Sequence, residues 1–526
     1  MRQLFSRTGV LVCLSSLLQI ASFPLAGPLP YWQAQLCLVA LVPMCVAMMS
    51  GGVKSVRAGA LYGYLGGVIF YAGNCYWIYQ TMYLYGGLPK PVALLILFLF
   101  ALYLGLYHAL FAGLLVSVRK RISGWAVGLF AGCAWVAVEL ARSRITSFPW
   151  DLLGYAQIDN GLLMRLVPVT GVMGVSLVVA LVNGMLAWGW THRTVRGAKL
   201  SLFALSAAVV CLIAAGMLVR PVLTPAERAG SSATLLQENL EVGAVGKGMP
   251  VASLAKELDS FIGASGTPVD LRTDAAVRGE AIALVVWPEA PSHLQSNDLN
   301  MMTRLGGMAR TLHAPVIAGM LGVDVSNASE RGYFLYDSAQ WLDAEGAAQG
   351  RYDKIHLVPW GEFIPYHELF SFAHKLTEGA GSMDRGSQRN NFVTGGHGYG
   401  TFVCYESIFG DEVRDFVRGG AEVLVNISDD GWYGDTGAPW QHLNMARMRA
   451  IENHRWVLRA TNTGVTTAID PQGRMAAEAP RHVRGAYTFG FGYLQDVTFY
   501  TRYGDWLAWV CAALTLAAVA FGALRK

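Results

Sequence analysis

The sequence predicts two parts of different fold class: a polytopic α-helical membrane part and an α/β domain inserted before the last helix. The 526-residue chain is 53% hydrophobic and only 14% charged, whereas soluble proteins carry about 25% charged residues. Only three of its 36 acidic residues precede residue 220. Short β-rich runs alternate with helical patterns after that point. We therefore expect a membrane part over 1–219, an extracytoplasmic domain over 220–504, and a last helix with a short tail over 505–526.

Eight apolar stretches approach or exceed the roughly 20 residues that a helix needs to cross a bilayer. They cover 9–27, 31–50, 58–84, 91–117, 124–141, 161–190, 200–219 and 505–524. The first stretch follows Arg2 and Arg7, which is also typical of a signal peptide. Six further spans follow it without a clear small-residue cleavage site, which favours an uncleaved first helix.

The Lys/Arg balance of the short loops predicts the orientation, because such residues collect on the cytoplasmic side. One side carries Arg2, Arg7, Lys54, Arg57, Arg119, Lys120, Arg121, Arg193, Arg196, Lys199, Arg525 and Lys526. The short loops of the other side carry only Lys90, Arg142 and Arg144. Both termini are therefore expected in the cytoplasm and residues 220–504 outside it. The net charge of +4 is small and scattered, which does not favour a nucleic-acid partner.

The outer domain is expected to be an α/β layered structure, because its strands alternate with helices. Strands are predicted at 233–239, 281–287, 315–321, 333–342, 400–405, 422–428, 456–462 and 466–470. Helices are predicted at 253–263, 298–312, 407–419 and 440–453.

Cys404, in FVCYESIFG, is the one cysteine of eight that lies outside the apolar stretches. A buried cysteine often packs as a small hydrophobic side chain; the alternative is a nucleophile. The residues before Cys404 predict a strand and those after it a helix. At such a turn, free backbone N–H groups and the helix dipole can stabilise a thiolate, which makes the nucleophile a serious alternative.

Two further stretches supply the groups that a thiol nucleophile needs, namely a base and a donor for the oxyanion. VVWPEAP (285–291) places Glu289 directly after a strand, and YDKIHLVPWGEFIP (352–365) contains Lys354 and Glu362. Each of these residues alone would more often be a solvated surface charge. Together, at the ends of apolar runs in one α/β domain, they indicate an active site.

These motifs carry a resemblance to known families. WPE, K-x-H-L-V-P-W-G-E and C-Y-E resemble the nitrilase superfamily, whose active site is a Glu–Lys–Cys triad. The whole chain resembles the bacterial apolipoprotein N-acyltransferase family, which joins a nitrilase-like domain to eight membrane helices. The narrower resemblance lies in residues 426–466 (NISDDGWYGDTGAPWQH and the following run), SFPWDLLGYAQ (147–157) and NCYWIYQTMYLYGGLP (74–89).

The resemblance implies a nitrilase-like αββα sandwich and a role for each matching residue. Cys404 would be the nucleophile, Glu289 the general base, and Lys354 the group that stabilises the oxyanion and lowers the thiol pKa. Glu362 would support Lys354. Tyr405 and Glu406 would assist beside the nucleophile, with the Tyr405 N–H as a second oxyanion donor.

The implied reaction is a ping-pong acyl transfer at the periplasmic face of the bacterial inner membrane. A membrane phospholipid donates an acyl chain to Cys404 as a thioester. The α-amine of the diacylglyceryl-cysteine of a lipoprotein then accepts the chain. The resemblance implies no metal and no organic cofactor.

Several residues are expected where the active site meets the lipid. Trp and Tyr favour the membrane interface, and the candidates for an apolar substrate-binding rim are Trp150, Trp360, Trp432, Tyr433 and Trp440. Residues 361–386 combine apolar side chains with glycines, which predicts a mobile lid. Glu139, which is costly in lipid unless it is paired, is expected to pair with Arg142.

Two other functions compete with acyl transfer. A membrane-anchored nitrilase-like amidase, which would hydrolyse a carbon–nitrogen bond, would share the triad but would need only one anchor helix. A transporter with an outer binding domain would need repeated halves and polar residues in mid-membrane, and the sequence has no evident repeat and few such residues.

Overall fold

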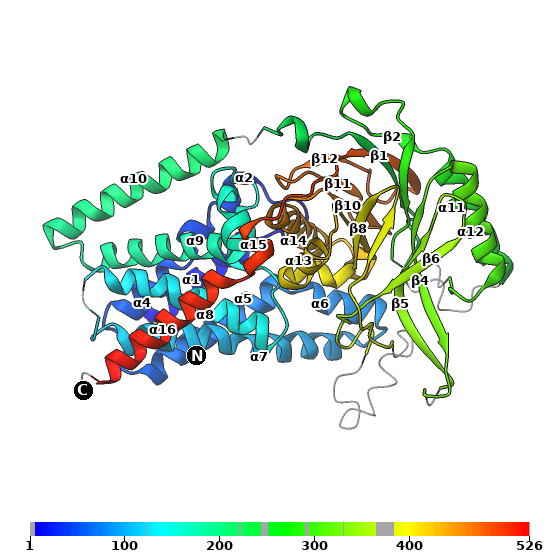
Figure 1. Ribbon diagram of the computed structural model, residues 1–526. Coiled ribbons are helices and arrows are strands. Elements are labelled where there is room, and N and C mark those ends of the chain that lie inside the picture. Colours follow the sequence, from blue (N-terminus) through cyan, green and yellow to red (C-terminus); the bar gives the residue numbers. More distant parts are fainter. Residues whose placement is uncertain are drawn as a thin grey trace.

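The computed structural model describes residues 6–122, 124–219, 222–242, 251–289, 294–329, 331–363 and 383–524. The first part is helical and the second is an α/β domain, from which the last helix returns to the first part (Figure 1). The helical part contains α1 (Arg7–Ala21), α2 (Tyr31–Ala34), α3 (Cys37–Ala40), α4 (Val42–Met49), α5 (Val56–Asn74), α6 (Trp77–Gln80), α7 (Lys90–Val118), α8 (Ala126–Ile145), α9 (Val167–Thr191), α10 (Arg196–Leu218) and α16 (Trp506–Leu524).

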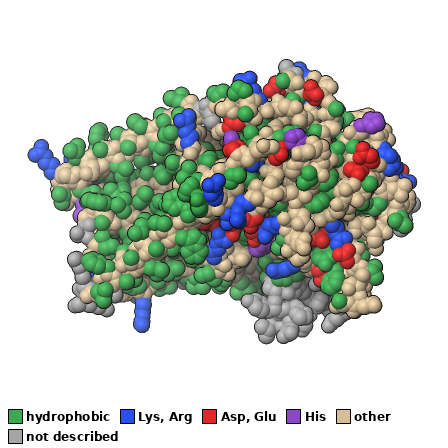
Figure 2. Space-filling model, in the orientation of Figure 1, with side chains coloured by type: hydrophobic (Ala, Val, Ile, Leu, Met, Phe, Trp, Pro, Cys, Tyr) green, Lys and Arg blue, Asp and Glu red, His purple; other side chains and the backbone are tan. Residues whose placement is uncertain are grey.

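Five helical segments of the described chain are long and apolar enough to cross a membrane. They are Tyr31–Met49, Lys90–Val118, Ala126–Ile145, Leu163–Thr191 and Arg196–Leu218. Two shorter apolar helices, Arg7–Ala21 and Trp506–Gly522, accompany them. Hydrophobic side chains cover the visible face of this part, whereas charged ones gather on the α/β domain and at the junction (Figure 2). Every expected apolar stretch is thus largely helical, but a count of eight spans stays a prediction.

Three of the expected long helices are interrupted. Between α3 and α4, the backbone N–H groups of Leu41 and Val42 donate to Asn183 Oδ1 at 2.8 and 3.0 Å, so a side chain from α9 holds the break. The stretch expected at 58–84 divides into α5, α6 and a π-helical turn, η1 (Thr81–Tyr85). The third interruption is a kink in α9 at Gly171 (φ 64°), where an added Cβ would lie 2.4 Å from the Tyr500 ring.

The α/β domain contains two sheets. The seven-stranded sheet has the order β2 (Val269–Asp270), β13 (Gly485–Phe491), β1 (Ser231–Gln237), β3 (Ile282–Val286), β4 (Val316–Val325), β5 (Tyr333–Leu342) and β6 (Ala348–Asp353). The six-stranded sheet has the order β12 (Met475–Glu478), β11 (Thr467–Ile469), β10 (Val457–Thr461), β9 (Val423–Ser428), β8 (His397–Val403) and β7 (Asn391–Thr394). The helices of the domain are α11 (Val251–Gly266), α12 (Leu299–Leu312), α13 (Gly410–Arg418), α14 (Ala438–Asn453) and α15 (Phe499–Tyr503).

The two sheets pack face to face between two layers of helices, as the predicted αββα sandwich requires. Alternate residues of a strand point to opposite faces. Val286 accordingly belongs to the same hydrophobic cluster as Phe402 and Val425 of the other sheet, whereas Val285 belongs to the cluster that includes Phe261 of α11. α11 and α12 cover the outer face, and α13 and α14 lie toward the membrane part (Figure 1).

All eight predicted strands are present, within a few residues of their expected bounds, but five strands were missed. These are β2, β6, β7, β12 and β13. β13 matters most, because it pairs with β1 in the middle of its sheet, with Leu235 opposite Tyr487. A partner so distant in the sequence leaves no local signal.

Candidate active site

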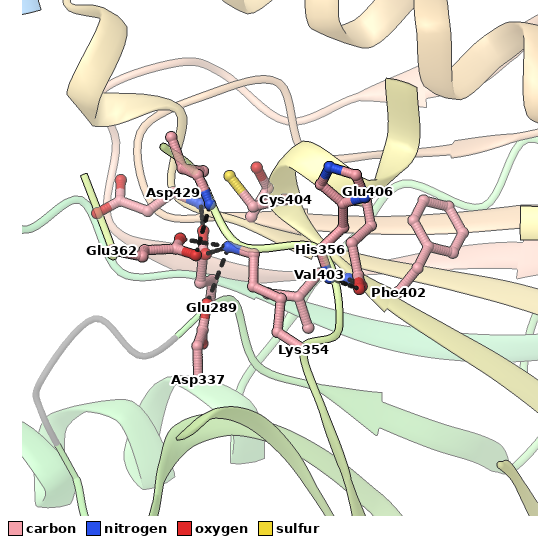
Figure 3. Close-up of polar contacts among 12 residues, drawn as sticks. Glu289, Asp337, Lys354, His356, Glu362, Phe402, Val403, Cys404, Glu406 and Asp429 are labelled. Atoms are coloured by element: carbon pink, nitrogen blue, oxygen red, sulfur yellow. Dashed lines mark hydrogen bonds and ion pairs between the residues drawn. The ribbon is translucent and has the colours of Figure 1, made fainter. Parts of the chain in front are cut away.

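The candidate catalytic residues lie at the carboxyl ends of strands from both sheets. Glu289 follows β3, Lys354 follows β6, and Cys404 follows β8. Asp429, which the sequence analysis did not select, follows β9. In α/β sheets this edge is where ligands usually bind. The sandwich therefore brings the predicted triad together from three distant segments (Figure 3).

The Lys354 ammonium group lies among three carboxyl groups and is fully buried. Its Nζ is 2.9 Å from Glu289 Oε1, 3.0 Å from Asp337 Oδ2 and 2.5 Å from Glu362 Oε1. The carboxylate oxygens of these residues lie within 4.8 Å of one another, close enough to hold a metal ion together. In this protein each of the three carboxyl groups is already bonded to Lys354, so the ammonium group occupies the place that a metal ion would take.

The pKa values of the groups in this cluster shift in different directions. Burial acts to lower the pKa of Lys354, but Glu289, Glu362 and Asp337 outweigh it and raise that pKa well above its usual value. Burial and the charges of Glu289 and Glu362 raise the pKa of Asp337 well above its usual range. The pKa of Glu289 is lowered despite burial, because Lys354 and hydrogen bonds from Asp337, Lys354 and Cys404 favour its ionised form. Of the three carboxyl groups, Glu289 is therefore the one that favours the ionised form, whereas the pKa values of Asp337 and Glu362 are both raised, which favours a proton on one of them.

Glu289 is also fixed from its other side. The Asp429 backbone N–H donates to Glu289 Oε2 at 2.6 Å, and the Asp429 side chain accepts from the Gly431 N–H at 3.0 Å. Burial and the nearby Glu289 charge raise the pKa of Asp429 to about 7. With both of its oxygens bonded, the Glu289 carboxylate has a defined orientation toward the thiol.

Cys404 opens a short 3-10 helix, η8 (Cys404–Ile408), directly after β8. Its φ of 47° lies in the left-handed region, which a side chain with a Cβ adopts only at a cost in free energy. The first N–H groups of a helix have no partner within it, which leaves the Tyr405 N–H available to a substrate oxygen. The predicted strand-to-helix turn is confirmed, with a 3-10 turn before α13.

Lys354 acts to lower the thiol pKa of Cys404, as expected, but the net shift is upward, so the expected low thiol pKa is not found. Burial and the Glu289 charge raise the pKa of Cys404 well above its usual value, and Lys354 offsets only part of this rise. A buried site disfavours the charged thiolate. The protonated thiol is therefore the favoured form of Cys404 at rest.

Glu406 connects the segment that bears Lys354 to the strand that bears Cys404. Its Oε1 accepts from the Tyr352 hydroxyl at 2.7 Å and from the backbone N–H groups of Ile355 and His356 at 2.9 and 3.1 Å. Its Oε2 accepts from the Val403 N–H at 2.8 Å. Glu406 therefore holds the segment of Lys354 and the end of β8 at a fixed distance, which is how it would support the site. Glu362 likewise accepts from the Val358 N–H at 3.0 Å while it holds Lys354.

The five aromatic residues expected at the lipid level do not form one rim. Trp360 and Trp432 are exposed, at 42% and 38%, and Trp440 is partly exposed. Trp150 and Tyr433 are instead buried. Their rings lie 5.7 Å apart in the junction between the two parts. Trp150 and Tyr433 therefore pack with Trp77 inside the junction, and a substrate contact for any of the five residues stays a prediction.

Most of the predicted lid lies outside the described residues, which resume at Met383. Of its apolar side chains, Phe363 is described, and it packs beneath the Arg385 guanidinium at 4.8 Å. Gly386 adjoins the active site, since its N–H donates to the Lys354 carbonyl at 2.9 Å. The lid stays a prediction.

The segment 147–157 of the membrane part lies directly against the catalytic domain. Arg142 Nη1 donates to the Trp150 carbonyl at 2.7 Å, and the Leu153 N–H donates to Glu139 Oε1 at 2.7 Å. The expected Glu139–Arg142 ion pair is therefore wrong: both side chains bind this segment instead. Trp150 Nε1 in turn donates to Gln441 Oε1 of α14 at 2.8 Å.

Comparison with known proteins covers both parts of the chain. Residues 15–185 match the apolipoprotein N-acyltransferase N-terminal domain, and residues 241–488 match the carbon-nitrogen hydrolase domain. An apolipoprotein N-acyltransferase of Geobacter metallireducens is 32% identical over 98% of this chain and 95% of its own length. The chain belongs to the apolipoprotein N-acyltransferase family.

A second relative agrees with this membership. The apolipoprotein N-acyltransferase of Methylococcus capsulatus is 34% identical over 88% of this chain and 87% of its own. Among solved structures, Saccharomyces cerevisiae Nit3, of the nitrilase superfamily, aligns with 52% of this chain and 93% of its own, at 15% identity and a TM-score of 0.37.

Three polar residues of the candidate active site were not predicted from the sequence. Asp337 lies within a strand, where an acidic residue in a buried run was the available signal. Asp429 belongs to a stretch that was used only for the family resemblance. His442 lies in the same stretch, and its contacts depend on α14 packing beside the nucleophile.

Proposed function

We propose that the protein transfers an acyl chain from a membrane phospholipid to the α-amine of the N-terminal diacylglyceryl-cysteine of lipoproteins, through a thioester on Cys404. Family membership supports lipoprotein N-acylation, and the observation that carries the mechanism is the single buried cluster of Glu289, Lys354 and Cys404. The cluster offers a thiol, an ionised base and a fixed positive charge, which are the groups that thioester chemistry needs.

In the first half-reaction, the Cys404 sulfur attacks the ester carbonyl carbon of the phospholipid while Glu289 accepts the thiol proton. The negative charge that forms on the carbonyl oxygen is stabilised by the Lys354 ammonium and the Tyr405 N–H. Collapse of the tetrahedral intermediate forms the thioester and breaks the ester C–O bond. The departing alkoxide takes the proton from Glu289 and leaves as a lysophospholipid.

In the second half-reaction, the α-amine of the lipoprotein attacks the thioester carbonyl. Glu289 accepts a proton from the attacking nitrogen, the same donors stabilise the oxyanion, and the C–S bond breaks. The Cys404 sulfur regains a proton from Glu289 as the amide product leaves. Exclusion of water from the buried site would limit the competing hydrolysis of the thioester.

We further propose that eight helices cross the inner membrane, with both termini in the cytoplasm and the catalytic domain in the periplasm. The five long apolar helices and the two shorter ones support a multi-span membrane part. Both substrates keep acyl chains in the bilayer, which suits an active site directly above the membrane helices. The amidase alternative is not favoured, because the relatives match the membrane part as well as the hydrolase domain.

Transfer can be tested with purified protein, phospholipid and a synthetic diacylated lipopeptide whose N-terminal amine is free. The proposal expects a triacylated lipopeptide and an equal amount of lysophospholipid, and neither product with Cys404→Ala or Glu289→Gln. A matched lipopeptide with an acetylated amine should receive no chain. Release of ammonia from simple amides, without lipopeptide acylation, would instead support the amidase.

A further inference from the structure

His442, on the first turns of α14, is fully buried beside the nucleophile. Its Nε2 lies 3.0 Å from the Cys404 carbonyl oxygen and 2.6 Å from Ser407 Oγ. Its Nδ1 lies 2.8 Å from Asp430 Oδ1. The ring therefore joins the backbone of the nucleophile to a buried acid.

The partners of His442 determine which way its hydrogen bonds run. A carbonyl oxygen can only accept a hydrogen bond, so Nε2 donates to the Cys404 carbonyl. On the other side, Arg459 Nη2 binds Asp430 Oδ2 at 2.6 Å. Although burial opposes ionisation, Arg459 and His442 hold the pKa of Asp430 well below its usual range. Asp430 is thus a carboxylate that accepts from Nδ1 and fixes the plane of the ring. With both ring nitrogens donating, His442 is an imidazolium whose charge Asp430 balances.

The accepting carbonyl belongs to the peptide unit between Cys404 and Tyr405, and the other end of that unit is the Tyr405 N–H. Hydrogen bonds in a chain polarise one another, so a donor at the carbonyl makes the N–H at the opposite end a stronger donor. The same bond holds the carbonyl direction that the left-handed Cys404 backbone requires (φ 47°). Both effects act where the oxyanion would form.

We propose that His442 is a positioning residue for acyl transfer, which aligns and polarises the Cys404–Tyr405 peptide so that its N–H stabilises the oxyanion. This inference rests on the proposed function of Cys404 and the Tyr405 N–H. His442 touches neither substrate nor sulfur in this scheme; it acts through the peptide bond.

The membrane part contributes to this arrangement. The Trp150 indole stacks on the His442 ring, with centroids 5.8 Å apart and planes 14° apart. The neighbouring Gln441 binds Trp150 Nε1 and the Pro24 carbonyl, each at 2.8 Å. Segment 147–157 thus closes one face of the imidazole. Its contact with α14 is a direct link from the membrane helices to the proposed oxyanion donor.

A hydrolytic triad of Ser407, His442 and Asp430 is the other arrangement that these contacts suggest. Ser407 is fully buried, whereas Cys404 keeps a small exposed fraction of 6%, so the attacking atom that a substrate carbonyl can reach is the cysteine sulfur. Nε2 also carries the proton that it donates to the Cys404 carbonyl, and it therefore cannot accept one from serine. The network supports the cysteine rather than forming a second nucleophile.

The test compares two reactions of Cys404 in full-length protein in detergent. Acylation by a phospholipid in single turnover passes through an oxyanion, whereas alkylation by iodoacetamide does not. For His442→Asn, which is too short to reach the carbonyl, we expect acylation to slow about 10- to 100-fold, somewhat less than the loss of a whole oxyanion donor. Alkylation should stay within about threefold, because the thiol and its base are unchanged. His442→Gln, whose amide can still donate to the carbonyl, should regain much of the acylation rate.

His397→Asn is the matched control, because His397 lies at the far end of β8, where its Nδ1 is 2.6 Å from Glu422; both rates should equal those of the wild type. Parallel losses of acylation and alkylation, or unchanged acylation in His442→Asn, would overturn the inference. If His442→Asn does not fold, the same two rates are compared in His442→Gln. If acylation and alkylation of His442→Gln are both slower than in the wild type, and acylation is slowed no more than alkylation, the inference is overturned. Absence of acylation in the wild type would instead refute the proposed function.

Discussion

Lys354 balances the charges of the active site at the scale of single residues. A buried ammonium group is tolerated only when it is paired, and three carboxyl groups compete for it here. Since three ionised carboxylates around one cation would leave excess negative charge in a buried place, at least one should hold a proton. The raised pKa values of Asp337 and Glu362 favour a proton on one of these two, and we assign it to Asp337, whereas the lowered pKa of Glu289 favours its ionised form.

Replacing Asp337 by asparagine should preserve acyl-transfer activity at neutral pH and change the pH dependence of that activity. The side-chain amide that Asp337→Asn introduces can accept from Lys354 and donate to Glu289, as the protonated acid does, so we expect activity within about threefold of wild type at neutral pH. In the wild type, rising pH ionises Asp337, removes its hydrogen bond to Glu289 and adds a negative charge beside Lys354. Activity should then fall, whereas the variant should lack this decline.

The pH profile of acyl transfer, extended into the alkaline range, measures this difference. Asp337→Val serves as the comparison that removes both hydrogen bonds, and it should lose about 10- to 100-fold because the base is no longer oriented. The same alkaline decline in Asp337→Asn and in the wild type would show that another group titrates.

The catalytic residues could be predicted from the sequence to the extent that a motif carried them. Glu289, Lys354 and Cys404 stand in short runs next to predicted strands, and the structure brings them together. The protonation state of Cys404 could not be predicted, because it depends on how deeply the sandwich buries the thiol. Asp337 faces Lys354 through the pairing of β5 with β6, a register that no local pattern fixes.

At the scale of elements, the segment 147–157 joins the two parts through the Trp150–Gln441 hydrogen bond. Its short helix, η2 (Leu153–Gln157), packs against α9. Gly154 lies at the closest approach: its N–H donates to Ser176 Oγ at 2.8 Å. A Cβ at this position would lie 2.4 Å from the Val172 carbonyl oxygen. A backbone atom cannot move aside as a flexible side chain could.

Gly154→Ala should therefore displace η2 together with the neighbouring Trp150. We expect a loss of about 1–3 kcal/mol in the free energy of unfolding, as for other overpacked sites, and slower acylation of Cys404. Thermal unfolding in detergent and single-turnover acylation measure the two effects.

Gly263→Ala is the matched control for this substitution. Gly263 lies within α11, and an added Cβ there would meet nothing within 4 Å. Alanine should stabilise this helix by about 0.5–1 kcal/mol and leave acylation unchanged. Equal stability of Gly154→Ala and wild type would contradict the close packing of η2 on α9.

Elements with a strong local pattern were predictable, and elements defined by distant partners were not. The eight predicted strands are all present, because each is a short apolar run. β13 was missed, since its position follows from pairing with β1 near the other end of the domain. The break between α3 and α4 depends on Asn183 of α9, so the apolar run around it predicted one continuous helix.

At the scale of the whole molecule, the junction between the two parts is charged and hydrogen-bonded as well as apolar. Arg144 of α8 binds Asp411 of α13 and Asp505, just before α16. Arg447 of α14 binds Asp159 at 2.5 Å. Partly exposed ion pairs contribute little individually, but these join helices of both parts around the site. We infer that the domain is held in a fixed orientation above the helices.

The proposed topology predicts which surfaces an external reagent can reach. Val325, at the end of β4, is 82% exposed, and Val195, between α9 and α10, is 59% exposed. In intact spheroplasts, a membrane-impermeant maleimide should label Val325→Cys but not Val195→Cys. After permeabilisation both should react. The wild-type protein gives the background of its own cysteines, and labelling of Val195→Cys before permeabilisation would contradict the orientation.

The most direct test of the central claim is the intact mass of the purified protein after incubation with a phospholipid of defined acyl chains. The account predicts that the wild type gains the mass of one acyl chain and that neutral hydroxylamine removes it. Cys404→Ser should form no adduct that hydroxylamine removes. A diacylated lipopeptide should take the chain from the wild-type protein and carry it as an amide. No acyl adduct on the wild type, while lipopeptide acylation still proceeds, would show that transfer does not pass through Cys404.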